Sequence, residues 1–154
     1  MKAVTRLFGT IEIEDDKIIT MERGMIGFPD LRHFALIFDK DKKKTGFRIM
    51  WLQSMDDGEL AFPVTDPGYV LEDYKPSVKE EILETLGDCR DDNMYLLVTV
   101  TVPKNVEDFS VNLKAPIIVN MDTNKGAQII ADNDYSHRYK IYDLLKAKKE
   151  RMGE

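Results

Sequence analysis

Short apolar stretches separated by turn residues run along most of the chain. Ile11 and Ile13 alternate with acidic neighbours, which is the period-two pattern of a strand with one buried face. Residues 34–38 are a continuous apolar run of strand length, typical of a buried strand. The pattern predicts short strands at residues 7–14, 18–21, 34–38, 47–53, 60–64, 95–102, 111–113, 116–121 and 128–131.

Two segments carry helical signals instead. Ser77 is followed three residues later by Glu80, as in a capping box, and Gly87 supplies a stop. We therefore predict an internal helix that begins directly after Ser77. Its apolar side chains share one face: Val78, Ile82, Leu83 and Leu86. Residues 138–151 form a second predicted helix, whose narrow apolar stripe suggests that it docks loosely or frays.

About eight or nine short strands, one internal helix and a C-terminal helical segment predict a mainly β fold, namely a small antiparallel β-barrel. Closing the sheet removes open strand edges, which otherwise invite aggregation. The 154 residues fit a single domain. We expect the barrel domain to span residues 1–137, followed at 138–154 by a basic helical tail that is either part of the same domain or frayed.

The acidic residues are concentrated in one stretch. The net charge is -6, yet residues 56–92 alone hold twelve acids and three bases. Direct nucleic-acid binding is disfavoured, because phosphate contacts require clustered Lys and Arg. A basic protein partner is favoured, because opposite charges steer association. A solvated acidic surface that only aids solubility explains the same charges about equally well.

Nothing in the sequence predicts a cofactor, a metal site or a catalytic centre. The two histidines, His33 and His137, have no cysteine or second histidine at ligand spacing. The single cysteine, Cys89, lies among carboxylates that disfavour its thiolate. The N-terminus lacks a signal peptide, and no apolar run reaches the length of a membrane span. We therefore expect a cytoplasmic protein that is not an enzyme and does not bind membranes.

Amides and glycines occupy unusual positions. Gln53 and Asn112 lie within or beside predicted strands, where they are either satisfied core groups or edge groups left for the backbone of a partner. Gly24 and Gly27 bracket a constrained loop. A GxxG sequence also clamps RNA backbone in KH domains, but there it lies between two helices. Here a strand precedes it and no basic cluster flanks it, so the structural role is favoured.

An ordered set of motifs resembles the flagellar assembly factor family, FliW, over nearly the whole chain. Each motif is weak alone, but their succession is specific. The motifs are Phe8-Gly9-x-Ile11, Gly24-x-Ile26-Gly27-Phe28-Pro29, Trp51-Leu52-Gln53-Ser54, Phe62 with Asp66-Pro67, Val111-Asn112-Leu113-x-Ala115-Pro116-Ile117 with Asn120, Gln128-Ile129-Ile130, and Tyr135. Met25 and Asp30 depart from the family pattern, which leaves finer details of partner affinity open.

The resemblance implies a cytoplasmic, non-enzymatic regulator in flagellated bacteria. Such proteins bind newly made flagellin and the translational repressor CsrA. When flagellin is exported, the freed regulator captures CsrA and relieves repression of flagellin mRNA. The motif residues implied to bind partners or to support the fold are Gly24, Gly27, Phe28, Gln53, Asn112, Pro116, Asn120 and Gln128.

The acidic stretch suggests where a basic repressor binds, because carboxylates beside it would repel RNA. We expect the CsrA-type partner to contact Glu72, Asp73, Tyr74, Asp91 and Asp92. Tyr74 is the aromatic anchor in this interpretation. Two other hypotheses remain: a small β-barrel that binds an apolar small-molecule ligand between its strands, and an enzyme with a hidden acid pair.

Overall fold

The structure, a computed structural model, describes residues 1–38 and 47–151. The described residues form eleven strands and two α-helices, with three short 3-10 helices. The strands are β1 (Lys2–Thr5), β2 (Gly9–Glu12), β3 (Ile19–Thr20), β4 (His33–Ile37), β5 (Met50–Ser54), β6 (Ala61–Thr65), β7 (Met94–Thr101), β8 (Ser110–Val111), β9 (Ile117–Asn120), β10 (Lys125–Gln128) and β11 (Tyr139–Lys140). The helices are η1 (Asp15–Lys17), η2 (Pro67–Tyr69), α1 (Glu80–Thr85), η3 (Val106–Asp108) and α2 (Tyr142–Arg151).

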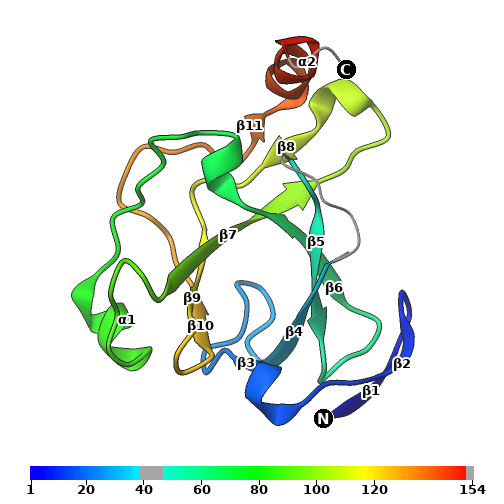
Figure 1. Ribbon diagram of the computed structural model, residues 1–154, viewed down its shortest axis with the longest axis vertical. Coiled ribbons are helices and arrows are strands. Elements are labelled where there is room, and N and C mark those ends of the chain that lie inside the picture. The colour runs from blue at the N-terminus through cyan, green and yellow to red at the C-terminus, as the bar shows by residue number, and fades with distance from the viewer. Residues whose placement is uncertain (39–46, 152–154) are drawn as a thin grey trace.

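Seven strands form an unevenly closed, barrel-like ring (Figure 1). The order around it is β7-β6-β5-β4-β3-β10-β9, and β9 pairs back onto β7. Neighbours run antiparallel except β3 and β10, which are parallel and share one residue pair, Thr20 with Lys125. The predicted mainly β fold is therefore confirmed, and the ring is weakest where these two strands meet.

Strand β7 is the longest, and it connects the ring to the elements outside it. Its first half pairs with β9 and its end pairs with β8. Residues 112–116 leave the ladder between β8 and β9 as a short excursion. Strand β8 in turn pairs with β11, which leads into α2.

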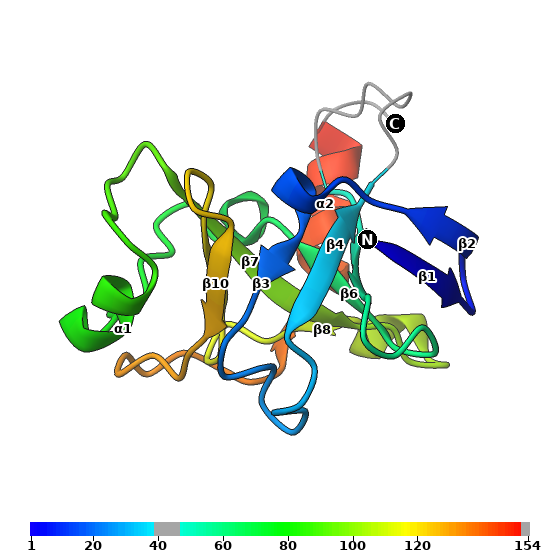
Figure 2. The ribbon, with the colours of Figure 1, turned by 90° about the horizontal axis from the view of Figure 1, so that it is seen from below.

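Apolar side chains gather inside the ring and beneath the elements that cover it. Inside the ring, Phe34, Leu52 and Leu97 are fully buried in the main cluster. The hairpin of β1 and β2, set apart from the ring in Figure 2, covers Ala35 and Met55 on the outer side. These clusters hold the barrel together because each removes apolar surface from water.

The C-terminal segment is docked, although we expected it to dock loosely or fray. Residues 139–140 are a strand rather than part of a helix, and Ile141 is fully buried beneath α2. Leu144 and Leu145 pack against the same cluster. The Lys148 side chain donates to the Tyr69 carbonyl and lies over the Tyr69 ring. The narrow stripe suffices because β11 fixes the entry to the helix.

Two other expectations about elements are wrong. Helix α1 begins at Glu80 with Lys79 at its N-cap, and no side chain caps it. The backbone N–H of Ser77 instead donates to Asn133 Oδ1 at 2.6 Å, so the predicted capping box does not form. The last ring strand, β10, covers residues 125–128 rather than 128–131, because Lys125 already pairs with Asn120 across a tight turn.

Candidate functional site

The side chain of Asn112 shapes the excursion between β8 and β9. Its Oδ1 accepts hydrogen bonds from the backbone N–H groups of Lys114 and Ala115, both at 3.1 Å. This side chain replaces the ladder partners that the two N–H groups lose, as in an Asx turn. Pro116 is buried, and its carbonyl accepts from Ile129 at 3.0 Å. Both motif residues therefore support the fold.

Gln128 joins two family motifs that are far apart in the sequence. Its Oε1 accepts from the backbone N–H of Ile26 at 2.8 Å, and its Nε2 donates to the carbonyl of Ala115 at 3.1 Å. One side chain thus ties the loop at residues 24–28 to the excursion at 112–116. Sequence alone gave no sign of this link, because its ends are about a hundred residues apart.

The loop at residues 24–28 is a tight turn that presents apolar side chains to solvent. Met25 and Phe28 exchange backbone hydrogen bonds across it, at 3.1 and 2.7 Å. Gly27 follows Ile26 at the tip with a φ of +88°, which fits the third position of a type II turn. Ile26 is 52% exposed and Phe28 is 38% exposed, whereas Met25 is buried.

Gln53 is fully buried and holds the loop that follows β5. Its Nε2 donates to the carbonyls of Ser54, Gly58 and Leu60, at 2.9, 3.3 and 3.0 Å. Its Oε1 is buried without a hydrogen-bond partner in the described part of the chain. The structure thus assigns this amide to the core, where no partner can reach it.

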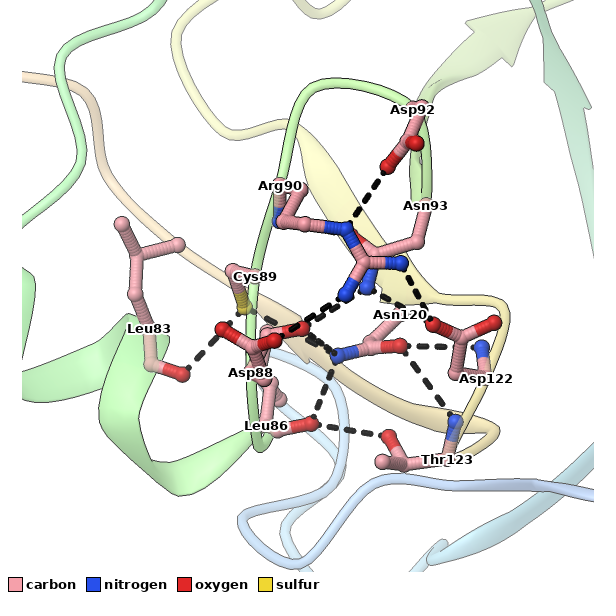
Figure 3. Close-up of polar contacts among 10 residues, drawn as sticks. All are labelled: Leu83, Leu86, Asp88, Cys89, Arg90, Asp92, Asn93, Asn120, Asp122 and Thr123. Carbon is pink, nitrogen blue, oxygen red and sulfur yellow. Dashed lines mark hydrogen bonds and ion pairs between the residues drawn. The ribbon is translucent and has the colours of Figure 1, made fainter.

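Asn120 also holds loops in place with its side-chain amide (Figure 3). Its Nδ2 donates to the carbonyls of Leu86 and Asp88, at 3.0 and 3.1 Å. Its Oδ1 accepts from the backbone N–H groups of Asp122 and Thr123, at 2.9 and 3.3 Å. The buried amide therefore links the end of α1 to the turn between β9 and β10.

The part of the acidic stretch between η2 and β7, residues 70–93, lies on one side of the barrel in both ribbon views, and we call it the acidic segment; Asp56, Asp57 and Glu59 lie apart from it in the turn between β5 and β6. Glu72 and Asp73 are exposed, as expected of a binding surface. Tyr74 is buried instead, and its hydroxyl donates to the Leu113 carbonyl at 2.6 Å. Burial raises the pKa of this phenol, with a smaller contribution from Tyr135. Tyr74 is part of the core and does not anchor a surface contact.

The second expected acidic pair differs in its two members. Both are exposed, but Asp92 pairs with Arg90 at 3.0 Å (Figure 3). Arg90 also contacts Asp88 and Asp122, at 3.0 and 3.2 Å. The hydrogen bond to Asp92 is the main cause of the raised pKa of Arg90. This arginine offsets part of the negative charge in the loop, so Glu72 and Asp73 carry the more available carboxylates.

A groove of about 540 Å³ opens between strands of the ring, and we call it the apolar groove. The side chains that line it are mostly apolar and come from β3, β4, β5, β7 and β9 and the turn after β9, including Ile19, Leu36, Met50, Leu97, Val119 and Met121. Four of these belong to the main core cluster, so the groove reaches the core. Lys17, Arg48 and Asp16 add charge at its edge. Sequence patterns do not locate this groove, because the residues that line it are scattered over the chain.

Chemically reactive groups do not converge in the described part of the chain. No three residues of the His, Cys, Asp and Glu types come together there as a metal site would require. His33 Nδ1 lies 3.0 Å from Asp56, whose carboxylate also accepts from the backbone N–H groups of Arg32 and His33. None of the helices in the described segments is long and apolar enough to cross a bilayer.

Known proteins resemble this chain along nearly its full length. The family model described as FliW protein matches residues 2–141. A flagellar assembly factor FliW from Lachnospira eligens is 48% identical over 148 residues, which covers 95% of this chain and 97% of that protein. Its counterpart from Thermotoga neapolitana is 40% identical over 143 residues, covering 92% and 93%. A crystal structure of the flagellar assembly factor FliW superposes with a TM-score of 0.80 at 28% identity, covering 92% of this chain and 96% of that one.

Proposed function

This chain belongs to the FliW family of flagellar assembly factors, and on that premise we propose that it is a non-enzymatic cytoplasmic regulator that binds flagellin and the translational repressor CsrA. While flagellin is abundant, it occupies the protein. Once flagellin has been exported, the freed protein captures CsrA and relieves repression of flagellin mRNA. Two protein partners and no chemical step are required.

The exposed carboxylates on one side of the barrel are the observation that carries the CsrA half of the proposal. Glu72, Asp73 and Asp91 are exposed along the acidic segment. An RNA-binding protein presents a basic surface, which such a segment attracts. Carboxylates docked beside that surface also repel the phosphates of a competing RNA. The repressor then releases its RNA, although the protein does not copy the shape of RNA.

The test uses purified protein, CsrA, flagellin and a labelled RNA that carries the repressor site. The protein is expected to bind CsrA and flagellin separately, and to release the labelled RNA from CsrA. Added flagellin is expected to restore RNA binding by CsrA. A protein that binds flagellin but leaves the CsrA–RNA complex intact would remove the repressor from the proposal.

The apolar groove favours a second candidate function, the binding of an apolar small molecule. Its volume of about 540 Å³ lies within the range of small-molecule sites, which is roughly 300–1,000 Å³. Solvent extraction of the purified protein followed by mass spectrometry tests this directly. A stoichiometric apolar compound in the extract would support the candidate, and an empty extract would count against it.

A further inference from the structure

The apolar groove has a wall that suits a hydrocarbon chain. Its volume is about 540 Å³, and Leu36, Met50, Leu97 and Val119 are among the side chains that line it. Three of these are buried, namely Met50, Leu97 and Val119, whereas Met121 in the same lining is 52% exposed. A ligand chain that lies along this wall is removed from water. Selection among apolar ligands therefore depends on the polar groups of the groove.

The polar side chains of the groove offer mostly hydrogen-bond donors. Lys17 and Arg48 line the groove and are exposed, and both side chains can only donate. Among the residues that the structure describes, neither cation forms a salt bridge. Asp16 is the one carboxylate among the described lining residues, and the Asn124 side chain already donates to the Asp16 carbonyl. Two positive charges against one negative charge favour a ligand whose polar end is an anion.

The hydroxyl of Tyr95 adds a donor within the groove. Within the described residues it donates to the Met50 sulfur at 4.0 Å, which is a weak acceptor. Burial raises the pKa of this phenol, Asp66 raises it further and Arg48 lowers it, so the hydroxyl keeps its proton at neutral pH. Asp66 is outside the lining of the groove, and its carboxylate accepts from the Gly68 backbone N–H at 2.8 Å. A ligand in the groove therefore meets the charge of Arg48.

We propose that the apolar groove binds an amphipathic carboxylate of the fatty-acid class, with its hydrocarbon chain along the apolar wall and its carboxylate at Arg48 and the Tyr95 hydroxyl. This inference rests on the second candidate function and names the class of its small molecule. A carboxylate has two oxygens, which accept hydrogen bonds from a guanidinium and a hydroxyl. A neutral hydrocarbon leaves both donors without an acceptor.

The first test varies the ligand. Binding of decanoate, dodecanoate and tetradecanoate to the purified protein is measured by calorimetry, below the concentrations at which micelles form. A single site is expected, with affinity rising about three- to fourfold for each added methylene. Dodecan-1-ol has the same chain without the charge, and it is expected to bind about tenfold more weakly than dodecanoate. Several molecules bound per protein, or equal affinity for dodecanoate and dodecan-1-ol, would overturn the inference.

The second test removes the donors from the protein. Arg48→Gln is expected to weaken dodecanoate binding about tenfold, and to change dodecan-1-ol binding by less than about twofold. Tyr95→Phe is expected to weaken dodecanoate binding about threefold or more. Lys104→Gln and Tyr139→Phe are the matched controls, because they remove a charge and a hydroxyl from residues outside the lining of the groove. Both controls are expected to bind dodecanoate like the unmodified protein.

Circular dichroism and thermal melting establish that each variant is folded. Should Arg48→Gln unfold, the salt dependence of the unmodified protein replaces it. Added salt is then expected to reduce the difference in affinity between dodecanoate and dodecan-1-ol, because it screens the exposed charge of Arg48. A difference that salt leaves unchanged, or donor variants that bind dodecanoate as tightly as the unmodified protein, would count against the carboxylate.

The outcomes separate this inference from the function on which it rests. If solvent extraction yields a stoichiometric neutral compound and dodecanoate binds no better than dodecan-1-ol, the second candidate function stands and the carboxylate assignment fails. If the extract is empty and none of the probes binds, both fail. The proposal for flagellin and CsrA is unaffected by either result, because it does not use the groove.

Discussion

At the scale of single residues, the family motif serves mainly to hold loops in place. Gln53, Asn112, Asn120 and Gln128 all direct their amides at backbone groups of neighbouring segments. For Gln53 and Asn112 the sequence favours a structural role over an edge group left for a partner, and the hydrogen bonds agree with the structural role. A sequence pattern does not separate the two roles fully, because a buried amide and an edge amide have the same sequence signature.

The two glycines of the loop at residues 24–28 are expected to differ when a side chain is added. A Cβ at Gly24 would collide with the Phe28 carbonyl oxygen, whereas a Cβ at Gly27 would meet nothing within 4 Å. Gly27→Ala is therefore expected to lower the free energy of unfolding by about 1–2 kcal/mol, because alanine is strained at the positive φ of this position. Gly24→Ala is expected to cost more, and denaturant midpoints of the two variants measure the difference. Equal midpoints would contradict the collision at Gly24.

Asp56 is expected to make stability depend on pH. Burial by itself would raise the pKa of this carboxyl, but hydrogen bonds from the backbone of Arg32 and His33 lower it below its ordinary value of 3.8. Because the folded pKa is the lower one, the stabilisation is present above pH 3.8 and is lost as pH falls through the folded pKa. Asp56→Ala is expected to cost about 1–3 kcal/mol at pH 7.

The measurement is denaturant unfolding of Asp56→Ala and the unmodified protein at a series of pH values. The difference in the free energy of unfolding between the two proteins is expected to become smaller in acid. Asp30→Ala serves as the control, because Asp30 is exposed and accepts no hydrogen bond within the described residues. A gap that stays constant down to pH 2 would mean that the carboxylate charge does not contribute.

At the scale of elements, sequence patterns located strands well and misplaced helix starts and chain ends. Alternation and apolar runs reveal a buried face, which is what makes a strand recognisable. Local signals failed where a distant residue competed. Asn133 accepts the hydrogen bond from the Ser77 N–H that a capping box directs to the Glu80 side chain. Ser110 and Val111 pair with residues 139–140, which makes these residues a strand.

Ser77→Ala is accordingly expected to have little effect. The hydroxyl caps no helix, and the bond to Asn133 comes from the backbone of Ser77. The free energy of unfolding is expected to change by less than about 0.5 kcal/mol. Asn133→Ala is expected to cost about 1 kcal/mol, because it removes the acceptor. A larger loss from Ser77→Ala than from Asn133→Ala would restore the capping box.

Ile141 tests how firmly the C-terminal segment belongs to the core. Ile141→Ala is expected to cost about 2–5 kcal/mol, as for other fully buried aliphatic side chains. Deleting residues 146–154 removes the Lys148 contact with Tyr69 but leaves Ile141, Leu144 and Leu145. This truncation is expected to stay folded by circular dichroism. If it unfolds while Ile141→Ala does not, the last part of α2 rather than its start secures the segment.

At the scale of the whole molecule, the fold class followed from the sequence and the surfaces did not. Strand count and turn spacing predicted a small barrel, but the apolar groove depends on which strands become neighbours. The acidic segment was visible as a run of charges. Its composition was not enough to show that Tyr74 points inward and that Arg90 joins Asp92, because side-chain direction in loops is set by tertiary contacts.

Charge reversal tests the acidic segment as a repressor site. Glu72→Lys with Asp73→Lys is expected to slow association with CsrA more than it speeds dissociation. The binding constant of the unmodified protein is expected to fall as salt rises, because exposed charges are screened beyond about 8–10 Å. Glu80→Lys with Glu81→Lys is the control within the same segment, since these exposed acids on α1 are expected to form a solvated face outside the binding surface.

Flagellin binding, which we expect to be mainly apolar, is expected to survive both reversals. The readout is stopped-flow association of each variant with CsrA at two salt concentrations. Repressor binding that is unaltered by Glu72→Lys with Asp73→Lys and insensitive to salt would leave the acidic segment as an aid to solubility alone.

The single parallel pair between β3 and β10 has a consequence for how the protein is made. Thr20 and Lys125 can pair only after more than a hundred intervening residues have left the ribosome. Closing so long a loop costs conformational entropy, so this pairing forms later than local contacts do. The hairpins of β4, β5 and β6 form from neighbouring segments, so they precede ring closure. The ring therefore closes only after residues 125–128 have left the ribosome, so a shorter nascent chain has no complete barrel.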